Sequence, residues 1–546
     1  MSFTVTQINK NVDYKKLILP GFIVLMLLHL IFTFSGFYGN DDILYAGYAA
    51  DIAYQGISLQ PATDHYQLRW TPIYFTAFFY RIFGINPFTS AIFSAVSFAI
   101  CGFILHKIMR HKKTALYLLV MSLFFLAHSV IFYMHRLLPD AGICLAVLWM
   151  YYAYRSFYEN THKPLLHAVH FAAALLFAVV TKESIIIVLP LFILIFLKDL
   201  FKRKNLSFWK YAIVFSVVFV FLYLLFFKIT TNDFLFRYQL LLSKKYETLC
   251  SYDTLPFIHT LKRISYKLWQ AMLLNGDFLV FLPGLAAAVY KNKILYTGIR
   301  KLDIFSFLFL LFCANFMTTS ITAYAPLCPD PRHYIFLMPF AAITGGPMLY
   351  AFFKEPEKFP VLPLLFGAAT AVMFMMHAGA TKYLYLACTL LFSGVYLTTI
   401  ISRKKILFKI SAAIFIAIFF INYLNAFIKP LYPVYWDHKQ VIENTFSGKK
   451  ISATVFSTKN CSIHLSKYFL KFKTGELHFF YTDSIKTYNA GQLYYMLNAG
   501  FNASAKNSID SLINLKTDRQ IFLAEHSNKI FLYRVDNAFL QMIKEK

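Results

Sequence analysis

Long apolar segments recur through residues 1–429 and are separated by short polar loops. A run of about 18 or more apolar residues can cross a hydrocarbon core about 30 Å thick as a helix. The lengths of these runs and the charges between them predict about thirteen membrane-spanning helices. The predicted spans are 17–37, 86–106, 115–134, 139–157, 165–181, 185–197, 209–229, 277–290, 302–321, 334–352, 360–377, 382–401 and 408–428. Because the sixth is short and contains Pro190, we expect it to be tilted or broken.

The loops between these spans alternate in charge. Lys and Arg gather in the loops 107–113, 155–163, 198–210, 291–301, 354–358 and 403–409. With the N-terminus in the cytoplasm, all of these basic loops fall on the cytoplasmic side, as the positive-inside rule requires. The first apolar run is too long for a signal peptide, so we expect a retained anchor. The absence of a transit peptide and of a clear disulfide set favours a bacterial inner membrane.

Two long loops and the C-terminal segment then fall on the other, extracytoplasmic side. In the loop 38–85, apolar residues of Asp42–Tyr54 recur at helical spacing, which predicts a helix lying in the membrane interface. The loop 230–276 combines basic residues with many aromatic ones. It either anchors the fold on lipid headgroups or admits an anionic lipid.

After residue 429 the composition becomes that of an ordinary soluble domain. The pattern predicts strands at 450–457 and 476–481, and a hairpin formed by 520–524 and 529–535. It also predicts helices at 488–499 and 507–514. Residues 430–546 are therefore expected to form a small α/β or α+β extracytoplasmic domain, following an all-α polytopic membrane domain at 1–429.

Composition excludes some classes of function. The formal net charge is +27, but the basic residues lie between spans instead of forming one patch, so we expect no nucleic-acid partner. Cys250, Cys328 and Cys461 fall in predicted external segments. Their odd number and the lack of a Cys-x-x-Cys spacing predict neither a disulfide framework nor a zinc site.

The candidate chemistry begins with Asp41 and Asp42, two adjacent acids directly after the first span. Ionisable residues at a membrane edge are costly and indicate function. Further ionisable residues on the same predicted side are Arg69, Asp140, Lys182, Arg332 and His333. Carboxylates act as a general base or hold a divalent cation, and cationic side chains bind phosphate.

Each of these residues also has a purely structural interpretation. Asp41 and Asp42 could cap the interfacial helix, and Asp140 could start its own helix. Lys182 could pair with Glu183 in a turn or reach toward the headgroups, and Arg332 could be an interfacial anchor. A functional interpretation is favoured because all of these residues fall on one side of the predicted membrane topology. That topology depends on the apolar runs and the basic loops, and not on these residues.

At these residues the chain resembles the polytopic GT-C glycosyltransferases, specifically the aminoarabinose-transferase-like and protein O-mannosyltransferase group. The motifs are Asp41-Asp42-Ile43-Leu44-Tyr45-Ala46, Arg69-Trp70-Thr71-Pro72-Ile73-Tyr74, Leu138-Pro139-Asp140, Val180-Thr181-Lys182-Glu183, and Arg332-His333-Tyr334 with Pro339. The resemblance covers the predicted membrane domain, and the C-terminal domain also has a counterpart in the family. The chain departs from the family at Leu68, where some members are acidic, and at Glu183, where many have Gly.

The resemblance implies a metal-dependent or metal-assisted inverting transferase that uses a polyprenyl-phosphate sugar, with a divalent metal ion as its cofactor. Asp41, with Asp42 beside it, would be the catalytic carboxylate that acts as a base on a lipid, glycan or protein acceptor. The donor phosphate would be bound by Arg69, Lys182, Arg332 and Tyr334. Asp140 and His333 would support the site or hold the metal.

Two other classes of function compete with this one. A polytopic transporter or lipid flippase also uses charged residues among many spans. However, the sequence shows no paired halves, and its charges gather at one edge. A scaffold whose external domain binds a partner is the third hypothesis. Release of free polyprenyl phosphate from a labelled lipid-linked sugar would distinguish an enzyme from a transporter and from a scaffold, because only the enzyme cleaves that bond.

Overall fold

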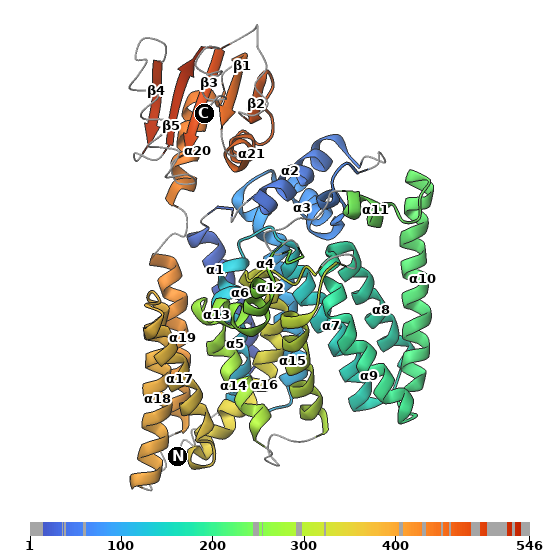
Figure 1. Ribbon diagram of the computed structural model, residues 1–546, viewed down its shortest axis with the longest axis vertical. Helices are drawn as coiled ribbons and strands as arrows, with labels where there is room; N and C mark the ends of the chain where they lie inside the picture. The colour runs from blue at the N-terminus through green and yellow to red at the C-terminus, as the bar shows by residue number, and fades with distance from the viewer. Residues whose placement is uncertain are drawn as a thin grey trace, which may run out of the picture.

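The computed structural model describes most of the chain, and the statements below concern the residues it describes. These are 15–34, 36–37, 40–57, 62–243, 251–253, 255–290, 298–320, 324–402, 408–428, 433–448, 451–457, 460–481, 492–498, 521–526 and 530–536. The largest part is a bundle of long helices, and a smaller part containing the sheet lies at one end of it (Figure 1).

A helix occupies each of the predicted spans within the described residues. These helices are α1 (Lys15–Thr33), α4 (Pro87–Met109), α5 (Thr114–Phe125) with α6 (His128–Tyr133), α7 (Pro139–Asn160), α8 (Pro164–Thr181), α9 (Leu189–Phe201), α10 (Leu206–Thr231), α14 (Phe278–Val289), α15 (Gly298–Phe316), α16 (Met338–Lys354), α17 (Val361–Met375), α18 (Thr381–Ser402) and α19 (Phe408–Ile428). Among the described residues, seven helical segments are long and apolar enough to cross a membrane, and four more apolar helices are shorter. The chain is an all-α polytopic membrane protein with a small C-terminal sheet.

The span around Pro190 is broken, as the sequence predicts. It starts with the 3-10 helix η2 (Glu183–Ile187), and α9 begins after it at Leu189. Pro190 lies in the first turn of α9, where its missing N–H breaks no helical hydrogen bond. The turn that precedes this break carries Lys182.

Short helices cover the end of the bundle nearest the sheet. They are α2 (Asn40–Gln55), η1 (His65–Leu68), α3 (Trp70–Phe83), α11 (Phe236–Ser243), α12 (Phe257–Lys262), the π-helix η3 (Arg263–Lys267), α13 (Leu268–Leu274) and the 3-10 helix η4 (Pro331–Leu337). The helix α2 confirms the helix expected at 42–54. The helix α3 was not expected, because its residues lie in the predicted loop 38–85. The short 3-10 helix η5 (Pro356–Lys358) follows α16.

The C-terminal part contains a mixed five-stranded sheet with the order β2-β1-β3-β5-β4. Its strands are β1 (Ala453–Ser457), β2 (Leu477–Tyr481), β3 (Gln492–Asn498), β4 (Ile521–His526) and β5 (Ile530–Val535), with helices α20 (Pro433–Phe446) and α21 (Asn460–Phe469) beside them. β1 pairs in parallel with β2 and β3, and β5 pairs antiparallel with β3 and β4. The predicted strands and hairpin are confirmed, and the whole is an α/β arrangement.

Two expectations from the sequence are wrong, one in the C-terminal part and one in the loop before η4. The helix predicted at 488–499 is instead strand β3, whose residues 493–496 are all buried between two neighbouring strands. A short apolar run does not distinguish a buried strand from a helix, and here tertiary pairing decides. Cys328 is disulfide-bonded although no framework was predicted, because disulfide pairing does not follow from local spacing. The helix predicted at 507–514 lies outside the described residues.

The C-terminal part rests on α2. Tyr54 in α2 donates a hydrogen bond from its hydroxyl to the Lys471 carbonyl at 3.0 Å. A Cβ built on Gly47 would lie 3.5 Å from the ring of Phe472, so α2 packs closely against the segment that follows α21. In Figure 1, α2 lies between the bundle and the sheet. The helix that carries Asp41 and Asp42 is therefore held from both sides.

Glycines allow the spanning helices to approach closely. A Cβ added at Gly346 in α16 would lie 2.4 Å from Cγ2 of Val120 in α5. Small residues at such crossings let helix backbones come together in a membrane, where packing drives association. By contrast, nothing lies within 4 Å of a Cβ built on Gly394 in α18.

We expect Gly346→Leu to lower the free energy of unfolding by about 1–3 kcal/mol, because the added side chain overpacks the contact between α5 and α16. The matched control is Gly394→Leu, which adds the same side chain to another spanning helix without a clash. Thermal unfolding of both purified variants in detergent measures the difference. Equal midpoints for the two variants would contradict this packing.

Candidate active site

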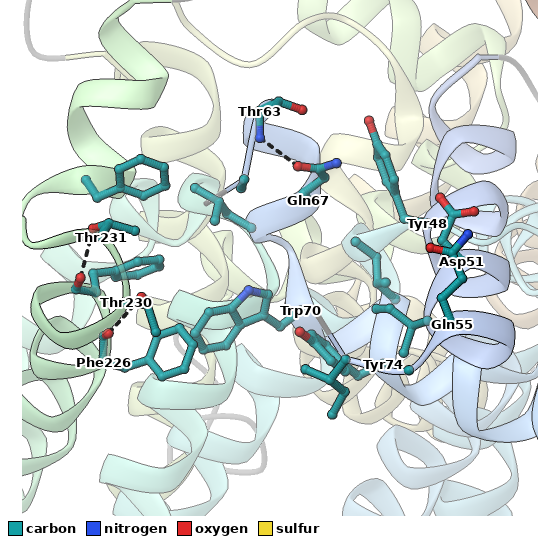
Figure 2. A pocket seen from close by; sticks show the side chains of 18 residues that line it. Tyr48, Asp51, Gln55, Thr63, Gln67, Trp70, Tyr74, Phe226, Thr230 and Thr231 are labelled. Carbon is teal, nitrogen blue, oxygen red and sulfur yellow. Dashed lines mark hydrogen bonds between the residues drawn. The ribbon is translucent and has the colours of Figure 1, made fainter. Parts of the chain in front are cut away.

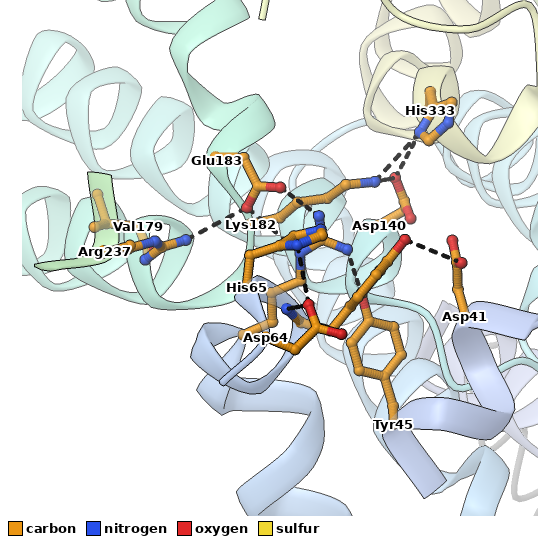
Figure 3. A network of polar contacts seen from close by, with 12 residues as sticks. Asp41, Tyr45, Asp64, His65, Asp140, Val179, Lys182, Glu183, Arg237 and His333 are labelled. Carbon is orange, nitrogen blue, oxygen red and sulfur yellow. Dashed lines mark hydrogen bonds and ion pairs between the residues drawn. The ribbon is translucent and has the colours of Figure 1, made fainter. Parts of the chain in front are cut away.

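Five separate elements bring ionisable side chains together at the end of the bundle that faces the sheet. Asp41 comes from the first turn of α2, and Arg69 follows η1. Asp140 lies in the first turn of α7, Lys182 joins α8 to η2, and His333 belongs to η4. Figure 3 shows Asp41, Asp140, Lys182 and His333 converging from different elements. The structure thus gathers most of the predicted site residues into one cluster.

Asp41 is paired and still accessible. Its Oδ2 accepts a hydrogen bond from Arg332 at 2.9 Å, and its Oδ1 accepts one from the Tyr66 hydroxyl at 3.4 Å. About 28% of the side chain is exposed. Its place in the first turn of α2 adds the favourable field of the helix N-terminus. A ligand can reach this carboxylate.

Asp42 has a different environment. Its side chain is fully buried, and its Oδ1 accepts a hydrogen bond from the backbone N–H of Ile43 at 3.1 Å. Successive residues of a helix point about 100° apart, so two adjacent acids cannot share one direction. Asp41 is the member of the pair that faces the cluster.

Lys182, Asp140 and His333 form a buried triad. The Lys182 ammonium donates to Asp140 Oδ1 at 2.7 Å and lies 3.3 Å from His333 Nδ1. His333 Nδ1 lies 3.2 Å from the same Asp140 oxygen. Burial lowers the pKa of Lys182, and the charge of Asp140 acts in the opposite direction. Asp140 Oδ2 is buried without a hydrogen-bond partner in the described part of the chain.

A second set of charges is centred on Glu183. Both of its oxygens accept hydrogen bonds from Arg69, and Arg237 in α11 lies 3.5 Å from Oε2. Arg69 also donates to the Tyr45 hydroxyl and lies over the ring of Tyr66, 4.8 Å from its centre. Burial raises the pKa of Tyr45 well above its usual range, against the effect of Arg69. The Tyr45 hydroxyl is therefore a neutral acceptor for the guanidinium.

Sequence reasoning left several members of this cluster out of the predicted site. Arg237 was one basic residue of a long loop, and Glu183 was only a departure from the family pattern or a turn partner for Lys182. The structure pairs Glu183 with Arg69 and Arg237 instead. Tyr45 lies in the same motif as Asp41, one helical turn further on, and this spacing was the available signal. No pattern along the chain marks Tyr66 or Arg237.

Tyr334 is directed elsewhere. Its hydroxyl donates to the backbone carbonyls of Leu327 and Cys328, and its side chain is buried. It holds the loop before η4 against that short helix, two residues from Arg332. A contact between Tyr334 and the donor phosphate stays a prediction.

The predicted metal ion would need several oxygen or nitrogen ligands that face one point. In the part of the chain that the structure describes, no group of three or more His, Cys, Asp or Glu side chains is arranged to hold a metal. Asp140 and His333 both contact the Lys182 ammonium, and Asp41 forms an ion pair with Arg332. As arranged here, these residues do not fit a divalent cation. The metal stays a prediction from the resemblance, and no step below depends on it.

A cavity of about 650 Å³ lies next to the cluster, between α2, η1, α3 and the end of α10. Figure 2 shows Tyr48, Asp51 and Gln55 on one side of it, and Trp70 and Phe226 on the other. One wall is polar and the other aromatic, which suits an amphiphilic molecule. The segment after η1 connects this cavity to Arg69.

Comparison with known proteins gives the fold. Neither a protein-family model nor a curated relative matches the sequence. Among solved structures, ArnT from Cupriavidus metallidurans aligns over 96% of this chain and 98% of its own, with a TM-score of 0.57 and 12% sequence identity. That structure was determined bound to undecaprenyl phosphate, and the apo structure aligns equally well. The chain has the GT-C fold of ArnT.

Because the alignment with ArnT covers the C-terminal sheet as well as the bundle, the chain shares the whole architecture of ArnT. The resemblance seen in the short motifs is confirmed at the level of the fold. The similarity also confirms an integral membrane protein. At this identity it does not assign roles to individual residues, which are argued below from the cluster itself.

We expect Asp140→Asn to make stability depend more steeply on pH. Without the carboxylate, the pKa of Lys182 falls further below its ordinary value of about 10.4. Between the two values the unfolded chain binds one more proton than the folded chain, so stability rises with pH. The variant should therefore recover stability relative to the wild type as pH increases from 6 to 9, by up to about 1.4 kcal/mol per pH unit within that window.

Thermal unfolding across this pH range measures the effect. The control is Glu357→Gln, which removes an exposed acid near the other end of α16. Its pH profile should follow that of the wild type. A profile for Asp140→Asn parallel to that of the wild type would show that Lys182 does not depend on this partner.

Proposed function

We propose that this chain is an integral membrane glycosyltransferase that moves a sugar from a polyprenyl-phosphate donor to a lipid, glycan or protein acceptor. One observation carries the proposal: an accessible carboxylate, Asp41, lies in a cluster of cations at one end of a bundle with the ArnT fold. ArnT itself binds undecaprenyl phosphate. A lipid-phosphate donor needs both kinds of group within one site.

The cations supply the binding of the donor phosphate. Arg69, Lys182 and Arg332 present guanidinium and ammonium groups, which form charge-assisted hydrogen bonds to phosphate oxygens. These groups are already in place, so stabilising the leaving phosphate requires little reorganisation during the reaction. Tyr334 would join them only if its hydroxyl left the backbone carbonyls that it now contacts.

Asp41 is the general base in this proposal, with Asp42 as the buried neighbour that fixes its helix turn. It takes the proton of the acceptor group as that group attacks the anomeric carbon of the sugar. The new bond to the acceptor forms while the bond between the anomeric carbon and the phosphate oxygen breaks. The electron pair of that bond leaves with the phosphate. Attack from the face opposite the phosphate inverts the anomeric configuration, and no covalent enzyme intermediate is needed.

Asp140 and His333 hold Lys182 in this proposal. Both residues contact the Lys182 ammonium, and no step of the proposed reaction is assigned to a metal ion.

The reaction is proposed to take place on the extracytoplasmic face of a bacterial inner membrane. Disulfides persist in oxidising compartments, and Cys328 is disulfide-bonded in the loop that leads into η4. The predicted basic loop at 198–210 joins α9 to α10 at the opposite end of these helices (Figure 1). Both observations support an N-terminus in the cytoplasm and the C-terminal sheet outside.

We expect Asp41→Asn and Lys182→Ala each to lower the rate of sugar transfer by about a hundredfold or more. Asp41→Asn removes the base, and Lys182→Ala removes a phosphate-binding cation. Both variants should still insert and accumulate. The assay follows release of free polyprenyl phosphate from a labelled polyprenyl-phosphate sugar by the purified proteins. A transporter, flippase or scaffold would release none.

The control is Glu443→Gln, which removes a surface acid from α20 on the side of the bundle that carries the sheet. It should transfer sugar at the wild-type rate. Wild-type activity in both Asp41→Asn and Lys182→Ala would overturn the assignment of the site. Absence of release by the wild type with every acceptor class would overturn the proposed function.

A further inference from the structure

Glu183 occupies an unusual place for a carboxylate in a site that would bind phosphate. It lies between two guanidinium groups, those of Arg69 and Arg237, and contacts both (Figure 3). A guanidinium recognises carboxylate and phosphate through the same forked arrangement of donors. The donors that would receive a lipid phosphate are therefore partly taken by an anion of the chain itself.

The two arginines keep other contacts that do not involve Glu183. Arg69 donates to the Tyr45 hydroxyl and stacks over Tyr66. Arg237 donates to the carbonyl of Val179 at 2.5 Å and to the Tyr223 hydroxyl at 2.7 Å. These contacts come from α2, η1, α8 and α10. The guanidinium groups are thus positioned even when the carboxylate is absent.

Glu183 is also the most exposed member of this group. Its side chain is 25% exposed, compared with 2% for Arg69 and 12% for Arg237. Solvent therefore reaches the carboxylate more readily than it reaches either guanidinium group. Of the three side chains, the carboxylate can leave its place with the smallest change in burial.

We propose that Glu183 is an internal competitor for the lipid phosphate. In the free enzyme its carboxylate holds the guanidinium groups of Arg69 and Arg237. The donor phosphate displaces it, and the carboxylate returns as the polyprenyl phosphate product leaves. This inference rests on the proposed function and adds a role in product release, in which Glu183 is a positioning residue that acts through the two arginines.

The charges of donor and product explain why such a competitor is useful. The phosphodiester of a polyprenyl-phosphate sugar carries one negative charge. The product is a phosphate monoester, whose charge at pH 7 is about −1.5 to −2. A purely cationic site would therefore hold the product more tightly than the donor and would slow turnover. A nearby carboxylate lowers the affinity for both, and it opposes the more highly charged product more strongly.

The test measures binding of labelled undecaprenyl phosphate to the purified full-length chain in lipid nanodiscs. We expect Glu183→Gln to bind it about tenfold more tightly than the wild type, because the amide no longer competes for the charged donors. In the transfer assay this variant should show a lower KM for the donor, a lower kcat and stronger inhibition by added undecaprenyl phosphate. If the Glu183 carboxylate only stabilised the fold, replacing it would leave the binding of undecaprenyl phosphate unchanged or weaken it.

Three further variants make the comparison specific. Glu159→Gln makes the same chemical change at another acid that contacts an arginine, Arg155 at 3.4 Å, at the far end of α7. It should leave binding unchanged. Glu183→Asp retracts the carboxylate by one methylene and should give intermediate affinity. Adding Arg237→Gln to Glu183→Gln should remove the gain, because one of the two freed donors is lost.

The outcomes separate the inference from the proposed function. Unchanged or weaker binding of undecaprenyl phosphate by folded Glu183→Gln would overturn the inference and leave the transferase intact. If Glu183→Gln does not fold, unchanged or weaker binding of undecaprenyl phosphate by folded Glu183→Asp would overturn the inference in the same way. A wild-type chain that neither binds undecaprenyl phosphate nor releases it from a labelled donor would overturn the proposed function itself.

Discussion

The pairing of buried charges at one end of the bundle is the constraint on which the rest of this structure depends. An isolated charge removed from water costs several kcal/mol or more, so each charge near the membrane must meet a partner. The pairs join segments far apart in the sequence: Asp41 with Arg332, Asp140 with Lys182, and Glu183 with Arg69. They therefore fix how α2, α7, η2 and η4 meet.

The helix α2 gives this assembly its rigidity. Its buried face, with Ile43, Ala46 and Ala50, packs within the molecule, while Tyr54 and Gly47 meet the C-terminal part. A carboxylate on a helix that is held from both sides keeps its direction better than one on a loop. The C-terminal sheet thereby contributes to the site although no residue of the sheet lies in the cluster.

Much of this architecture follows from the sequence because the membrane imposes a simple rule. Every backbone group in the hydrocarbon must be satisfied within its own segment, so length and apolarity alone reveal the spanning helices. The residues at the site are harder to predict. Asp41 and Lys182 lie in local motifs, whereas Arg237 enters only because α11 folds back over α8 and α10. Such a contact depends on tertiary packing, as does the strand β3 where a helix was expected.

The ion pairs of the cluster differ in one property that bears on chemistry. The Asp140 side chain is 7% exposed and its partner Lys182 is equally enclosed, so this pair behaves as a fixed part of the interior. Asp41 and Glu183 are 28% and 25% exposed, and each meets a less exposed arginine. A ligand can exchange with an accessible carboxylate far more easily than with a buried one, because water already solvates part of the group that must move. The cluster thus combines one permanent charge pair, which keeps Lys182 in position, with two pairs that can open toward a substrate.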